Sequence, residues 1–113
     1  MGSLSRNKGK RGERQVRDLF RDVGLTARRG QQFAGSPDSP DVIVESLSDR
    51  WHLEVKWVEG ICSAKMRSAI LQSQQDAGAK AWTVWHKEND HQWLVTLDAR
   101  DFVGLLAATL SSP

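Results

Sequence analysis

The segment Trp51–Val58 constrains the fold most, because apolar and polar side chains alternate along it. Successive side chains of a β-strand point to opposite faces of a sheet. The pattern therefore predicts one strand with an apolar tryptophan, leucine and valine face and a polar face that carries His52, Glu54 and Lys56. Such a strand needs neighbouring strands for its hydrogen bonds and a helix or second layer over its apolar side.

The rest of the chain supplies those neighbours. The predicted strands, in chain order, are 25–29, 41–45, 51–58, 81–86 and 92–97. Helical spacing of apolar residues predicts three helices, over 9–23, over 63–77 and after Asp98. Gly24 suits the C-terminal end of the first helix, and Asp98 suits the N-terminal cap of the last. The last helix carries its apolar residues on one side, at Phe102, Leu105 and Leu106. This order predicts the α/β class, with a mixed five-stranded sheet flanked by helices.

A chain of 113 residues fits one domain, which we place at 9–113 after a flexible basic segment at 1–8. No apolar run is long enough to cross a bilayer, so no membrane association is expected. Cys62 is the single cysteine, which excludes an internal disulfide and a cysteine-based zinc site. We therefore expect a cytoplasmic protein.

Positive charge is concentrated near the N-terminus. Residues 1–30 contain nine Lys or Arg residues against three acids, although the net charge of the whole chain is only +2. A basic segment on a nearly neutral body indicates a polyanionic partner such as DNA. The alternative is a solubilising tail.

Four residues could carry chemistry together. Asp41 opens a β-branched strand, and Glu54 lies on the next strand, so hydrogen-bonded pairing can bring the two carboxylates together as oxygen ligands for Mg²⁺. Lys56 shares the face of Glu54 at a distance of about 7 Å and could position a water or neutralise phosphate charge. Glu13 lies on the basic first helix. Each also has a simpler interpretation: a turn aspartate, a solvated charge pair, and an intrahelical ion pair between Glu13 and Arg17.

The combination resembles the PD-(D/E)XK nuclease superfamily, whose signature is Pro-Asp followed on the next strand by Glu-x-Lys. Pro40-Asp41 and Glu54-Val55-Lys56 match it. More narrowly, residues 8–57 are similar to the archaeal-type Holliday junction resolvases. The matching segments are Lys10-Arg11-Gly12-Glu13-Arg14, Gly24-Leu25 to Arg29, and Gly35-Ser36.

The resemblance implies a restriction-endonuclease-like fold and an endonuclease that uses Mg²⁺, for which Mn²⁺ can substitute. It makes Glu13, Asp41 and Glu54 metal ligands and Lys56 the catalytic lysine. It also implies a symmetric homodimer that resolves four-way junctions by paired incisions in DNA recombination and repair. The residues expected to contact DNA are Lys8, Lys10, Arg11, Arg14, Arg28, Arg29 and Ser36.

Some alternatives stay open at this point. Asp38 belongs to a second Pro-Asp, Pro37-Asp38, but we prefer Asp41 because Val42 continues directly into a strand. Gln74 or Gln75 could border the site, although an exposed polar face explains both. The histidines lack metal-ligand spacing, and tryptophans on the apolar face of 51–58 favour core packing over base stacking. In function, the alternatives are a restriction-like or nicking nuclease on duplex or flap DNA, and a DNA-binding module without catalysis.

Overall fold

The computed structural model describes residues 2–30, 40–58 and 63–111, which form three helices and a five-stranded mixed sheet. The predicted α/β class is confirmed. The elements are α1 (Gly2–Arg21), β1 (Ala27–Arg29), β2 (Val42–Val44), β3 (Trp51–Val58), α2 (Ser63–Ala77), β4 (Ala81–Glu88), β5 (Leu94–Leu97) and α3 (Ala99–Ser111).

The observed bounds of the helices and strands agree best with the predicted bounds where the sequence pattern is strongest. Strand β3 and helix α2 have the predicted bounds, whereas β4 extends two residues further and β1, β2 and β5 are shorter. Helix α1 begins at Gly2 and not near Gly9, so it includes most of the segment 1–8. An internal glycine costs a helix only about 1 kcal/mol, and lysine and arginine are good helix formers, so Gly9 does not mark a helix start. Gly24, with a φ of +89°, follows the helix end as expected.

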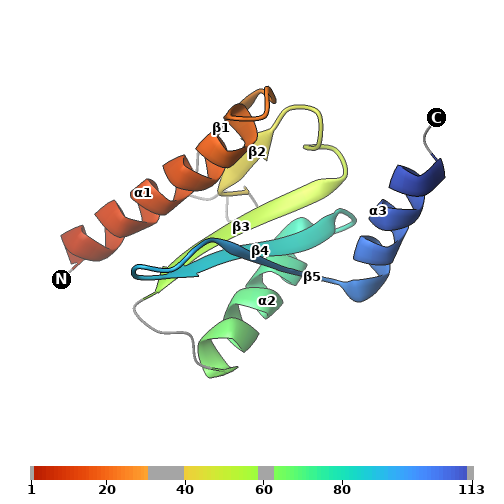
Figure 1. Cartoon of the computed structure of the whole chain (residues 1–113). Coiled ribbons are helices and arrows are strands. Elements are labelled where there is room, and N and C mark those ends of the chain that lie inside the picture. The colour runs from red at the N-terminus through yellow and green to blue at the C-terminus, as the bar shows by residue number, and fades with distance from the viewer. Residues whose placement is uncertain (1, 31–39, 59–62, 112–113) are drawn as a thin grey trace.

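The sheet has the strand order β1-β2-β3-β4-β5, and only β3 and β4 run parallel. This parallel pair requires a crossover, which α2 provides. Helix α1 packs on β1, β2 and β3, and α2 packs on the other face, against β3 and β4 (Figure 1). The described residues therefore form three layers, with β3 between two helices.

The apolar core lies between α1 and the sheet. Its buried members are Val16, Ala27, Val42, Val44, Leu53 and Val55. Gly12 allows α1 to approach β3 closely, because a Cβ atom there would lie 3.3 Å from Trp93 and 3.4 Å from Val55. The apolar face predicted for residues 51–58 thus faces the core, and Gly12 brings its neighbour Glu13 against the sheet.

Helix α3 extends away from these layers (Figure 1). The predicted cap is confirmed, since the Asp98 Oδ1 atom accepts a hydrogen bond of 2.8 Å from the Arg100 backbone N–H. No residue of α3 is buried, however, and Phe102, Leu105 and Leu106 are all nearly half exposed. Phe102 and Leu105 border a hollow whose other side is formed by the sheet. None of the helices in the described part of the chain combines the length and apolar character of a membrane span.

Candidate active site

Strand pairing brings Asp41 and Glu54 together. Asp41 immediately precedes β2, and Val42 is the register partner of Leu53 on the antiparallel strand β3. The Asp41 backbone N–H donates a hydrogen bond of 2.9 Å to the Leu53 carbonyl oxygen. Asp41 and Glu54 are therefore cross-strand neighbours that project from the same face of the sheet, as expected from the sequence.

Asp41 is held by backbone groups on both sides, one bonded to its carboxylate and the other to its main-chain carbonyl oxygen. Its Oδ2 atom accepts a hydrogen bond of 2.8 Å from the Val55 backbone N–H. Its carbonyl oxygen accepts another, of 2.9 Å, from the Gly30 N–H. A side chain at Gly30 would collide with the Pro40 carbonyl oxygen, so glycine permits this close approach of β1 to the start of β2.

The two carboxyl groups are buried, with Asp41 7% exposed and Glu54 4% exposed. Burial above all, together with the negative charges of Glu54 and Glu13 and a side-chain hydrogen bond with Glu54, raises the pKa of Asp41 to about 8, although the hydrogen bond from the Val55 N–H acts to lower it. Asp41 is therefore largely protonated near neutral pH in the metal-free protein. Ionising both carboxyl groups in this buried site is costly, and a bound cation would lower that cost.

Glu13 approaches the pair from α1, close enough for its charge to act on Asp41. Its Oε1 atom forms an ion pair of 2.9 Å with the Nε atom of Arg29 on β1. The alternative intrahelical pair of Glu13 with Arg17 is wrong, because Arg17 pairs with Asp18. Three carboxylates from three separate elements thus gather near the start of β2.

His52 makes a contact that the sequence did not reveal. It is 1% exposed, and its Nε2 atom lies 2.9 Å from the Oε1 atom of Glu54 on the same strand face. Asp76 of α2 joins them, since one ligand atom from each of the three residues lies within 4.8 Å of the others. The alternation of residues 51–58 placed His52 beside Glu54, but only the packing of α2 could place Asp76 there.

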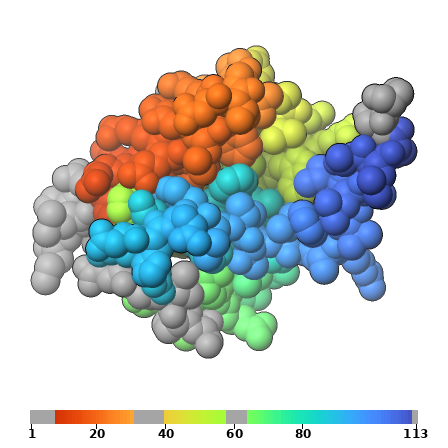
Figure 2. All heavy atoms as spheres, viewed as in Figure 1, coloured from red at the N-terminus to blue at the C-terminus, as the bar shows by residue number. Residues whose placement is uncertain are grey.

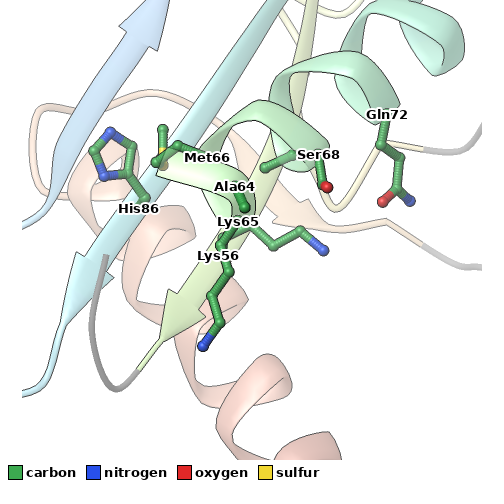
Figure 3. A pocket seen from close by; sticks show the side chains of 8 residues that line it. Lys56, Ala64, Lys65, Met66, Ser68, Gln72 and His86 are labelled. Carbon is green, nitrogen blue, oxygen red and sulfur yellow. The ribbon is translucent and has the colours of Figure 1, made fainter. Parts of the chain in front are cut away.

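Lys56 follows Glu54 on the same strand face and lines a pocket between β3, β4 and α2 (Figure 3). Figure 3 shows its ammonium group directed away from His86, while Lys65 extends in another direction. Burial lowers the pKa of His86. Its Nε2 atom lies 2.9 Å from the Thr96 hydroxyl oxygen, and its Nδ1 atom has no hydrogen-bond partner among the described residues. The glutamine that lines this pocket is Gln72 of α2.

Gln74 and Gln75 are both exposed and are absent from the lining of this pocket, so the simpler interpretation of these two residues is favoured.

The basic residues expected at DNA fall into three groups. Lys10, Arg14 and Arg28 are exposed. Arg29 is engaged with Glu13. Lys8 and Arg11 lie over the ring of Trp57, which is only half-buried instead of being a core residue. Ser36, and the alternative aspartate Asp38, lie outside the described residues.

Comparison of the chain with models of known protein families, with curated proteins and with solved structures gives no significant match.

Proposed function

We propose that this protein is a metal-dependent endonuclease that hydrolyses DNA phosphodiester bonds. The observation that carries the proposal is the buried Asp41–Glu54 pair on adjoining strands, with Glu13 nearby and Lys56 further along the same face of β3. Two carboxyl groups buried side by side are costly to a fold when both are ionised, and such groups concentrate at functional sites. The arrangement supports a restriction-endonuclease-like version of the α/β fold.

The donor set fits Mg²⁺, which prefers carboxylate oxygens. Asp41 and Glu54 would hold the ion, and Glu13 would complete the acidic group from the side of α1. When bound, Mg²⁺ or Mn²⁺ supplies Lewis-acid stabilisation of the phosphate charge. His52 fixes one oxygen of Glu54, so that the orientation of this carboxylate is set before a ligand arrives.

Lys56 supplies the positive charge of the site. It lies two residues beyond Glu54 on the same face of β3, so its ammonium group would act on a phosphate bound at the acidic pair. There it orients the attacking water or neutralises charge that develops on the phosphate. The exposed cations of α1 and β1 bind the DNA backbone without reading its sequence.

The finer proposal is that the substrate is a four-way junction cut by paired incisions. It rests on the resemblance of residues 8–57 to the junction resolvases and requires a symmetric homodimer with one site per subunit. A dimer gains avidity on a junction because both subunits bind at once, whereas a linear duplex engages one subunit productively. The alternative within the same chemistry is a nicking nuclease on duplex or flap DNA.

The test is incubation with a labelled four-way junction and a matched linear duplex, each with Mg²⁺, with Ca²⁺ and with excess EDTA. We expect cleavage with Mg²⁺, binding alone with Ca²⁺, and no cleavage in EDTA. Full activity in EDTA would contradict the mechanism. Equal cleavage of both substrates, or a monomer at micromolar concentration, would favour the nicking nuclease.

A further inference from the structure

Three cations from two distant parts of the chain surround one indole ring. The Lys87 Nζ atom lies 4.7 Å from the centre of the Trp57 ring, the Arg11 Cζ atom 5.1 Å and the Lys8 Nζ atom 5.6 Å. Lys8 and Arg11 belong to α1, whereas Lys87 is near the end of β4. We call these four residues the Trp57 cluster.

Neighbouring residues hold the cluster in its shape. The Trp57 Nε1–H donates a hydrogen bond of 2.8 Å to the Asn89 side-chain oxygen. The Gln15 side-chain oxygen accepts hydrogen bonds from the Trp93 Nε1–H at 3.0 Å and from Lys87 at 3.4 Å. In Figure 2 a small yellow-green patch of β3 lies between the red part of α1 and the light-blue β4–β5 hairpin. The cluster is therefore built from elements that the fold fixes.

Among the described residues, no ion pair joins a cation of this cluster to an acid. The ion pairs between described residues join Arg17 to Asp18, Arg29 to Glu13, His52 to Glu54 and His91 to Glu88. None of them includes a member of the cluster. Like charges held this close repel one another, and attraction to one indole face is a small compensation. An anion placed among them would relieve the repulsion.

We propose that the Trp57 cluster is a binding site for the phosphate backbone of DNA, and that Lys87 is one of its main contacts. The inference rests on the proposed function, since it extends the DNA surface from α1 to the β4–β5 hairpin. Three cations crowd the Trp57 ring, so the ring serves to hold them and does not stack on a base. The site therefore recognises phosphate and tolerates any sequence.

The position of the cluster favours DNA over another polyanion. Trp57 directly follows Lys56 on β3, and Arg11 is two residues from Glu13 on α1. The Gly12 backbone between them packs on the strand, where a Cβ atom would lie 3.5 Å from the Trp57 ring. A strand held by the cluster thus lies on the α1 face of β3, next to the turn of α1 that carries Glu13, whereas Glu54 and Lys56 project from the opposite face.

The test compares Lys87→Ala with Lys80→Ala, a control that removes an exposed lysine at the opposite end of β4. Binding of fluorescent duplex and junction DNA is measured in Ca²⁺ over a range of salt concentrations. We expect Lys87→Ala to weaken binding roughly three- to tenfold and to lower the salt slope by about one charge, with no change in Lys80→Ala. Equal slopes for the two variants would overturn the inference.

A second pair of variants tests the role of the ring. Trp57→Phe keeps an aromatic face for the cations and should bind DNA nearly as the wild type does, whereas Trp57→Leu should resemble Lys87→Ala. Thermal melting must show that each is folded. Competition by poly-glutamate as strong as that by DNA, with the same dependence on Lys87, would overturn the assignment to DNA.

Because these binding assays contain no Mg²⁺, they are independent of cleavage. A protein that does not cut but still depends on Lys87 for binding would keep the cluster and refute the nuclease. A protein that cuts DNA and binds it equally well without Lys87 would support the nuclease and refute the Trp57 cluster as a DNA-binding site.

Discussion

The two faces of β3 are both covered by helices, yet they differ in chemistry. The face toward α1 carries Leu53 and Val55, which pack in the apolar core. The face toward α2 carries His52 and Glu54, which are equally buried but polar. One strand therefore has an apolar face that stabilises the fold and a polar face whose burial carries a free-energy cost.

This difference separates residues that stabilise the fold from buried polar residues that we assign to the proposed function. Burying charged or polar groups destabilises a protein unless hydrogen bonds or an ion compensate them. Here a hydrogen bond from His52 and one from the Val55 backbone compensate the acidic pair in part. The raised pKa of Asp41 shows that the compensation is incomplete in the metal-free protein.

We expect the largest effect, a loss of DNA cleavage, from substitutions in the polar site. Asp41→Asn, Glu54→Gln and Lys56→Ala should each lower DNA cleavage by more than about a hundredfold, because each removes a charge that acts on the reacting phosphate. Cleavage rates at saturating Mg²⁺ measure the loss, and binding in Ca²⁺ serves as the control. If Asp41→Asn still cuts while Asp38→Asn does not, the other Pro-Asp supplies the ligand.

Truncating a side chain on the apolar face should instead lower stability and leave cleavage almost unchanged. Leu53→Ala should lower the free energy of unfolding by about 2–5 kcal/mol, because it leaves a cavity in the core under α1. The cleavage rate per folded molecule should stay close to that of the wild type. Urea unfolding and active-site titration measure the two quantities, and a folded but inactive Leu53→Ala would show that the two faces are not separable.

The metal-free protein should become less stable as pH rises from about 4 to about 8. The native state keeps the Asp41 proton until its pKa of about 8, whereas the unfolded chain releases it near 3.8, so this group favours folding at low pH. The expected loss is on the order of a few kcal/mol.

Asp41→Asn is the matched control, because it keeps the side-chain shape and cannot titrate. The lowered pKa of His86 acts in the other direction, since its contribution to stability is lost as pH falls below 6.5. The difference in unfolding free energy between the wild type and Asp41→Asn, taken at each pH, cancels the contribution of His86. Parallel stability curves for the two proteins would show that Asp41 is already ionised in the native state.

The smallest effect should come from His52, which touches Glu54 and not the substrate. His52→Leu should raise the Mg²⁺ concentration needed for half-maximal cleavage by roughly tenfold, with little change in the rate at saturating Mg²⁺. His91→Leu alters an exposed histidine and should leave both quantities unchanged. A lower rate at saturating Mg²⁺ with an unchanged metal requirement would mean that His52 does not act through metal binding.

The sequence by itself determined the strand 51–58, the helix 63–77, the α/β class and the proximity of Asp41 to Glu54. These depend on patterns within one element or on adjacent antiparallel strands, where local periodicity and pairing are sufficient information. It did not determine the start of α1, because a single glycine is a weak signal against a run of good helix formers.

Only the tertiary structure decided contacts between elements distant in the chain. The pairing of Glu13 with Arg29 and the approach of Asp76 to Glu54 depend on which helix covers which face, whereas the meeting of Lys87 with Trp57 depends on the register of the parallel pair β3–β4. The exposure of α3 is of the same kind, since its apolar pattern alone cannot show whether a neighbouring surface lies within reach. The periodicity of apolar and polar residues identifies the face of an element on which a side chain lies. Which residues from distant segments contact that side chain depends on long-range packing.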